Sequence, residues 1–182
     1  MQNKVITAAF CIVSFAVFVS GQNTSVYSSL EAAKCKTLES NPEEGGSYTG
    51  ECKGVGRYKL EIIEGDLRQT VNVVDPNGEK FELNLWDHFG GFSSVGQKAE
   101  WRIKGKIPVA LIFRFNVSEN SANPEGQLKT TSYLMVAKLG KEKPCVTDIV
   151  KPGKGQNAKA RKLADEPSHL CKSIGRTLIA TP

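Results

Sequence analysis

Pro108-Val-Ala-Leu-Ile-Phe-Arg-Phe-Asn-Val117 is the stretch of sequence that decides the fold. Large apolar side chains occupy every second position of it: Val109, Leu111, Phe113 and Phe115. They share one face of an extended strand, and Ala110 and Ile112 make the opposite face apolar as well. A strand that is apolar on both faces is covered on both faces, so this one is predicted to lie in the centre of a sheet.

The same alternation recurs on both sides of this strand. Five more segments carry it, around Tyr58–Ile62, Leu67–Val73, Phe81–Leu85, Ala99–Ile103 and Tyr133–Leu139. Turn signals separate them, among them Gly65-Asp66 and Asp75-Pro-Asn-Gly78. Strands at such regular spacing, without helical patterns between them, predict a mainly β fold, an antiparallel sandwich or barrel-like sheet of about six or more strands.

The amino terminus is typical of an export signal over residues 1–21. Lys4 precedes an uncharged, mostly apolar run from Val5 to Val19, and a polar run begins at Gln22. The apolar run is shorter than the roughly 20 residues that span a bilayer, so we expect cleavage rather than an anchor. No second long apolar run follows, which predicts a periplasmic or secreted protein without a transmembrane segment after cleavage.

The chain after the signal is long enough for one domain and too short for two of ordinary size. The full sequence of 182 residues contains 40% hydrophobic and 24% charged residues, which excludes disordered and collagen-like proteins. Residues 22–47 are polar, and we expect a lead-in there, with a short helix around Leu30–Leu38 as one interpretation. Residues 48–182 are expected to form a single β domain.

A helical tail is expected at the C-terminal end of this domain. Asn157 is the predicted cap of a helix over Ala158–Ala164 that ends before Pro167. A second helical turn is expected over residues 168–174. This tail carries Cys171.

Four cysteines remain after removal of the signal: Cys35, Cys52, Cys145 and Cys171. An even number in an exported chain predicts two disulfides, and three pairings are open. We favour the local one, Cys35 with Cys52 and Cys145 with Cys171, in which the second bond clamps the helical tail onto the last strand. Zinc is the competing interpretation, but the chain has no Cys-x-x-Cys and only 2 histidines, so neither a metal nor a cofactor is expected.

Several short motifs are spread over most of the mature chain. They are Cys35-x-x-Leu38, Gly54-x-Gly56, Gly65-Asp-Leu-Arg68, Ala99-Glu-Trp-Arg102, Pro108-Val-Ala-Leu-Ile112 and Cys145-Val with the late Cys171. In this respect the chain resembles a group of uncharacterised exported (periplasmic) bacterial proteins. The resemblance implies a periplasmic setting and two terminal cysteine pairs, and it brings no activity, ligand or catalytic residue with it.

Arg114 interrupts the apolar central strand, and a buried arginine needs a carboxylate partner. Glu100, on a strand expected nearby, is the first candidate for an ion pair that organises the sheet. Alternatively, the guanidinium group flanked by Trp101 holds a carboxylate or phosphate of a ligand. Arg114, Trp101 and Glu100 are therefore the candidate ligand-binding residues.

Positive charge gathers at the end of the chain, where residues 138–182 include 10 basic and 4 acidic residues. Lys159, Arg161 and Lys162 are expected to form a basic patch for an anionic envelope polymer or a periplasmic protein. A solvated helix face is the alternative. The run has no interleaved aromatic residues, so nucleic acid is not expected as a partner.

Asp87 and His88 form a titratable pair in an aromatic loop, which suits a general base. Neighbours in an extended chain point apart, however, and no Gly-x-Ser-x-Gly elbow surrounds Ser93 and Ser94. We therefore expect no catalytic residue and favour an exported, non-catalytic binding or structural module of the bacterial envelope. The alternatives are a small periplasmic hydrolase that uses Asp87 and His88, or a protein inhibitor of a cell-wall hydrolase.

Overall fold

The computed structural model describes residues 23–43, 46–119, 127–140, 142–167 and 170–172. The strands are β1 (Thr24–Ser29), β2 (Lys36–Asn41), β3 (Ser47–Lys53), β4 (Lys59–Gly65), β5 (Arg68–Val74), β6 (Lys80–Glu82), β7 (Phe92–Lys104), β8 (Ile107–Glu119), β9 (Lys129–Lys138) and β10 (Cys145–Val150). The helices are the short 3-10 segments η1 (Ala32–Lys34) and η2 (Leu85–Asp87) and the α-helix α1 (Gln156–Asp165).

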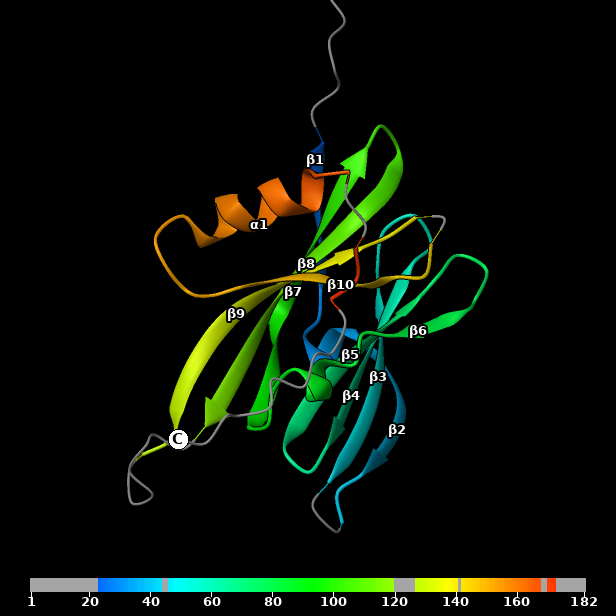
Figure 1. The fold of residues 1–182 in the computed structure, drawn as a ribbon. Coiled ribbons are helices and arrows are strands. Elements are labelled where there is room, and N and C mark those ends of the chain that lie inside the picture. Colours follow the sequence, from blue (N-terminus) through cyan, green and yellow to red (C-terminus); the bar gives the residue numbers. More distant parts are fainter. Residues whose placement is uncertain (1–22, 44–45, 120–126, 141, 168–169, 173–182) are drawn as a thin grey trace, which may run out of the picture.

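The strands form one sheet in the order β10-β9-β8-β7-β5-β4-β3-β2, with β1 also paired to β7 and β6 to β5. A single parallel pair, Arg68 with Ser93, joins β5 to β7, and the other strand pairs are antiparallel. We call β2 to β6 the first half of the sheet, and β1 with β7 to β10 the second half (Figure 1). The predicted fold class is confirmed: the protein is mainly β, with a short C-terminal helix.

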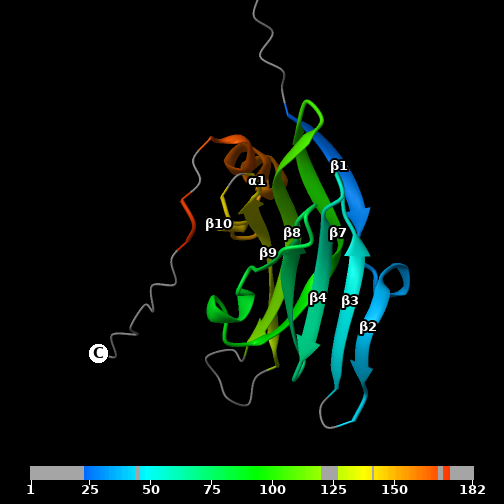
Figure 2. The ribbon, with the colours of Figure 1, turned by 90° about the vertical axis from the view of Figure 1, so that its right-hand side faces the viewer.

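The two halves enclose one apolar core. The first half contributes Cys52, Leu60, Ile62, Val71 and Val73, and the second half contributes Ala99, Trp101, Leu111, Phe113, Phe115, Met135 and Ala137. Helix α1 lies on the opposite, outer face of the second half (Figure 2). A second, smaller cluster forms there between α1, β8, β9 and the end of β10.

Strand β8 lies between β7 and β9, as its sequence predicted. Phe113 and Phe115 face the main core, whereas Ala110 and Ile112 pack against Ala160 of α1 on the outer face. Both faces of β8 are therefore covered, which explains why both are apolar.

The expected polar lead-in over residues 22–47 is wrong for most of its length. Thr24–Ser29 forms β1, Lys36–Asn41 forms β2, and η1 is the helical turn between them. Strand β1 pairs with β7 over its full length, but it is fixed there mainly by polar contacts. Strand β2 is exposed throughout. Neither strand carries an apolar face, so the period-two signal is missing.

The C-terminal helix exists, but its cap differs from the prediction. Gly155, with φ of 75°, precedes the first turn of α1, and Asn157 lies inside that turn. The positive φ at this position favours glycine over asparagine. The second helical turn expected over 168–174 lies largely outside the described residues.

Both predicted disulfides are present, Cys35 with Cys52 and Cys145 with Cys171. Beside the second bond, the amide of Lys172 donates to the carbonyl of Val146 in β10 at 2.8 Å. The segment after α1 is therefore attached to the edge of the sheet. Two disulfides indicate an oxidising, extracytoplasmic environment.

The predicted signal segment, residues 1–21, lies outside the described residues. Within the described part of the chain, no helix is both long and apolar enough to cross a membrane.

Candidate functional site

Helix α1 approaches the outer face of the sheet closely because its buried contacts are small. Ala160 and Ala164 are buried against Ala110, Ile112 and Val136 of β8 and β9. So few apolar atoms contribute only modestly to the attachment of the helix. Charged side chains of the sheet and the helix provide further contacts that hold α1 in place.

Arg102 of β7 holds the C-terminal end of α1. Its Nε and Nη2 donate to the two carboxylate oxygens of Asp165 at 2.9 and 2.6 Å. The same guanidinium donates to the carbonyl of Asn23 at 2.9 Å and to the hydroxyl of Ser25. Burial alone would raise the pKa of Asp165, but the hydrogen bonds from Arg102 and Asn23 outweigh it and lower that pKa.

Glu100 of β7 holds the middle of α1 through Arg161. The Arg161 Nε and Nη2 donate to the two Glu100 oxygens at 2.6 and 3.2 Å, and Nη2 also donates to the Tyr27 hydroxyl at 3.0 Å. Burial would raise the pKa of Glu100, but hydrogen bonds from Arg161 and Ser25 lower it below its ordinary value. Glu100 is therefore ionised and already paired.

Lys138, the last residue of β9, satisfies the final carbonyl groups of the helix. Its Nζ donates to the carbonyls of Leu163, Ala164 and Glu166 at 2.9, 2.6 and 2.5 Å. The Leu163 carbonyl also accepts a bond from the Glu166 amide at 3.3 Å, and the three carbonyls lie at the negative, C-terminal end of the helix dipole. The buried ammonium group of Lys138 therefore stabilises the C-terminal end of α1.

Between α1 and the sheet lies a cleft of about 260 Å³. It is lined by Tyr27 of β1, Lys98 and Glu100 of β7, Ile112, Phe113 and Arg114 of β8, Leu134 of β9, and Asn157 and Arg161 of α1. Three cations and one carboxylate meet there, so the cleft carries positive charge. The first turn of α1 adds to this potential, because it lies at the positive end of the helix dipole.

Arg114 meets neutral groups rather than a carboxylate. Its Nη1 donates to Ser132 Oγ at 2.9 Å and to Gln156 Oε1 at 3.4 Å. Gln156 is itself fixed, since its amide donates to the carbonyls of Ser132 and Val150 at 2.9 and 3.0 Å. The guanidinium group is thus held at the wall of the cleft with its charge uncompensated by these contacts.

The expected ion pair between Arg114 and Glu100 is wrong, because Glu100 pairs with Arg161 and Arg102 instead. Both residues nevertheless line the same cleft. Trp101 does not, because alternate residues of β7 face opposite ways. It is fully buried in the main core, and its indole donates to Ser28 Oγ at 2.9 Å.

The three residues of the predicted basic patch are separated by the turn of the helix. Lys159 and Lys162 are exposed, whereas Arg161 turns toward Glu100 and the cleft. The Arg161 side chain is also 41% exposed, but its charge is paired with Glu100. Arg161 belongs to the cleft.

Asp87 ends η2 and His88 follows it. Burial lowers the pKa of His88, Asp87 raises it and Lys172 lowers it again, with a net lowering. No hydrogen bond joins the His88 ring to another described residue. Ser93 Oγ is bonded to the backbone of Gln69, so this hydroxyl serves the sheet. The described residues also contain no group of three His, Cys, Asp or Glu side chains that could hold a metal ion.

Sequence reasoning missed Lys98 and Tyr27 as cleft residues. A signal for Lys98 was present, since Lys98, Glu100 and Arg102 alternate on β7 and so belong to one face. No such signal existed for Tyr27, because β1 itself was not foreseen.

Comparison with known proteins gives no match: no protein-family model, curated protein or solved structure is similar to this chain.

Proposed function

We propose that the protein is an exported, non-catalytic binding module of the bacterial envelope. Its cleft beneath α1 takes a phosphate or carboxylate group of an anionic envelope polymer. The exposed lysines of α1 support the same contact with neighbouring charges of that polymer.

The observation that carries this proposal is the state of Arg114. A planar guanidinium suits bidentate contact with a carboxylate or phosphate, and Arg114 donates to a hydroxyl and an amide oxygen, both of them neutral. Lys98 stands beside it in the lining of the same cleft. Arg161 is neutralised by Glu100, so Arg114 and Lys98 supply the charge for a ligand.

The size of the cleft limits what can enter it. A volume of about 260 Å³ is below the range of roughly 300–1,000 Å³ that is usual for whole drug-sized ligands. A single charged group fits better than a complete small molecule. A polymer that inserts one charged group into the cleft and lies along α1 would match both the small volume of the cleft and the exposed lysines of the helix.

The test is titration of the ¹⁵N-labelled mature chain with inorganic phosphate and with sodium polyphosphate. We expect saturable shifts at residues of the cleft and tighter binding of the polymer. Arg114→Gln should weaken binding about tenfold or more, since a hydrogen bond to a charged group contributes about 1.5–3 kcal/mol. Added salt should weaken polymer binding more than phosphate binding, because exposed charges are screened within about 8–10 Å.

The matched control is the double variant Lys159→Gln/Lys162→Gln, which removes two exposed charges of α1 and leaves the cleft intact. It should retain phosphate binding and lose part of the polymer affinity. If Arg114→Gln binds phosphate as tightly as the wild-type protein, the cleft is not the binding site.

A further inference from the structure

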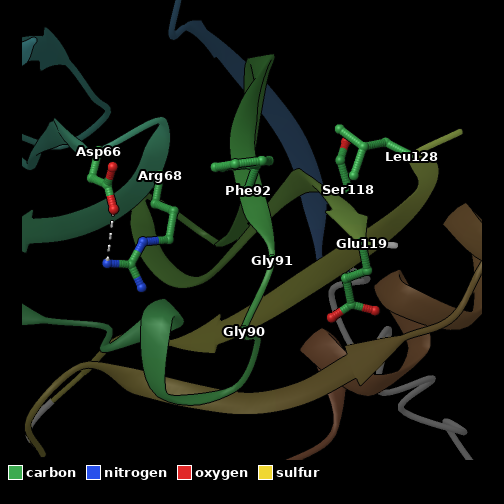
Figure 3. Close-up of a pocket in the computed structure, with 8 residues that line it drawn as sticks. All are labelled: Asp66, Arg68, Gly90, Gly91, Phe92, Ser118, Glu119 and Leu128. Carbon is green, nitrogen blue, oxygen red and sulfur yellow. Dashed lines mark ion pairs between the residues drawn. The ribbon is translucent and has the colours of Figure 1, made fainter. Parts of the chain in front are cut away.

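A second and larger cavity lies beside the junction between the sheet halves and shares no lining residue with the cleft beneath α1. It has a volume of about 640 Å³ and is bounded by the β4–β5 turn, the start of β7, the end of β8 and the residue before β9 (Figure 3). Both halves of the sheet contribute to its walls. The single parallel pair of Arg68 with Ser93 holds the halves together beside it.

Apolar side chains gather at the edge of this cavity. Phe92 and Leu128 line it and are 43% and 50% exposed. Leu67, 60% exposed, belongs to the adjoining β4–β5 turn, and Trp86, 39% exposed, lies against the guanidinium of Arg68. These are four of the nine large apolar side chains that are exposed among the described residues. Such a concentration at one cavity is typical of an interaction site rather than of scattered surface residues.

The β4–β5 turn beside this cavity has an unfavourable backbone conformation for its residues. Asp66 and Leu67 form a two-residue turn in which both have positive φ, 51° and 59°. Asn-Gly or Asp-Gly is preferred in such a turn, because a Cβ atom crowds the backbone there. Leu67 is both strained and exposed, so packing within the fold does not explain its presence. Residues that break a local rule in this way cluster at functional sites.

Peptide groups line the floor of the cavity. Gly90 and Gly91 have no side chains, and their backbone groups form no hydrogen bond with another described residue. Gly91 also approaches β8 closely, because a Cβ atom placed on it would lie 2.4 Å from the carbonyl oxygen of Ser118. A bound chain that carries its own peptide groups can pair with this segment.

Opposite charges stand on two sides of the cavity. The guanidinium of Arg68 lies 5.7 Å above the Trp86 ring, which restricts it, and its contact with Asp66 is long at 3.8 Å. Figure 3 shows Arg68 on one side of Phe92 and Glu119 on the other. A ligand with one acidic and one basic group matches this distribution.

We propose that this cavity binds an extended peptide segment of a partner protein. One apolar side chain of the segment enters between Phe92 and Leu128, with an acidic side chain at Arg68 and a basic one at Glu119. In an extended chain, residues i, i+2 and i+4 share a face, so three alternating residues make these contacts. The site is separate from the cleft beneath α1, and it stands whether or not that cleft binds anions.

The probes are the pentapeptides Ac-Asp-Thr-Leu-Thr-Lys-NH2 and Ac-Lys-Thr-Leu-Thr-Asp-NH2, which cover both chain directions. The control peptide is Ac-Asn-Thr-Leu-Thr-Gln-NH2. Binding to the mature chain is followed by Trp86 fluorescence and by ¹⁵N chemical shifts. One charged peptide should bind with saturable shifts around the cavity, at least fivefold more tightly than the uncharged one. Decanoate, an apolar chain with a carboxylate, is the probe for a lipid.

The variant Leu128→Ser gives a result that a merely structural role would not produce. Leu128 lines the cavity and is 50% exposed, so the urea midpoint should change little, while the affinity for the charged peptide should fall at least fivefold. Arg68→Gln should abolish the preference for the charged over the uncharged peptide. Ile107→Ala, which removes an exposed apolar side chain at a distant turn, should leave binding unchanged.

Three outcomes would overturn the proposal. The first is that neither charged peptide gives a saturable shift at millimolar concentration. The second is that decanoate binds in the cavity and the peptides do not. The third is that Leu128→Ser and Arg68→Gln bind the charged peptide as the wild-type protein does.

Discussion

Replacement of Arg102 by Met removes the contact that holds the end of α1, and it should strongly destabilise the fold. The Arg102 side chain is 7% exposed, and its guanidinium bonds both oxygens of Asp165, the Asn23 carbonyl and the Ser25 hydroxyl. Loss of one member of a buried pair typically costs about 3–5 kcal/mol. Asp165 is 30% exposed and can regain water, which places the cost near the lower end, about 3 kcal/mol.

Urea denaturation followed by fluorescence measures this cost. With a slope of about 2 kcal/mol per M, a loss of about 3 kcal/mol lowers the midpoint by about 1.5 M. The double variant Arg102→Met/Asp165→Leu removes both charges and should recover part of the loss. Lys34→Met is the control, because it breaks an exposed pair with Glu31 that contributes roughly 0–1 kcal/mol. A midpoint for Arg102→Met that equals the control's would refute the reasoning.

Three further outcomes follow from the contacts of α1 and the cleft. Because the pKa of Asp165 is lowered on folding, its stabilisation is complete above its unfolded value near 3.8 and is lost as the pH falls through the folded value. Asp165→Asn should therefore be less stable than wild type at pH 7, and the difference should shrink by pH 2 in urea titrations. Lys138→Met removes the Nζ donor of three carbonyls at the end of α1, of which only that of Leu163 keeps a backbone donor, so we expect a loss of about 2–3 kcal/mol and faster hydrogen exchange in the last turn of α1. Arg114→Ala breaks bonds to neutral partners only and should cost about 1 kcal/mol, and a drop in urea midpoint as large as that of Arg102→Met would contradict this.

The strands that bury apolar side chains could be predicted from the sequence. The strands that bury none could not. The alternation of apolar residues in β8 predicted both its place between two strands and its two covered faces. The turn predicted at Asp75–Gly78 joins β5 to β6, and the Gly78 amide donates to the Asp75 carbonyl at 3.0 Å. Strands β1 and β2 present polar residues to solvent and pair through the backbone, which leaves no periodic signal. Almost any sequence can form backbone hydrogen bonds to a neighbouring strand. Whether β1 and β2 become strands therefore depends on the strands beside them and not on their own side-chain pattern.

The candidate site was predicted in part: Glu100, Arg114 and Arg161 line the cleft as candidate residues, whereas Trp101 does not, and the ion pairs were not foreseen. Face alternation places Glu100 and Arg114 on the outer side of the sheet, and the sequence supports that much. Their partners depend on where α1 lies, because Arg161 of that helix takes Glu100. A tertiary contact between residues 61 positions apart cannot be derived from local periodicity.

Glu100 therefore takes part in both the attachment of α1 and the charge of the cleft, and these two roles predict effects of opposite sign. Glu100→Gln weakens the bond to Arg161 and should lower the urea midpoint. It also removes the one carboxylate that lines the cleft and leaves three cations there. Two unit charges about 4 Å apart interact by about 1 kcal/mol in water and more near a protein surface, so phosphate should bind at least about fivefold more tightly. Chemical-shift titration at neutral pH and low salt measures this gain. A fall in phosphate affinity for a Glu100→Gln protein that is still folded would mean that Glu100 positions the site, and that the charge of Arg114 and Lys98 does not define it.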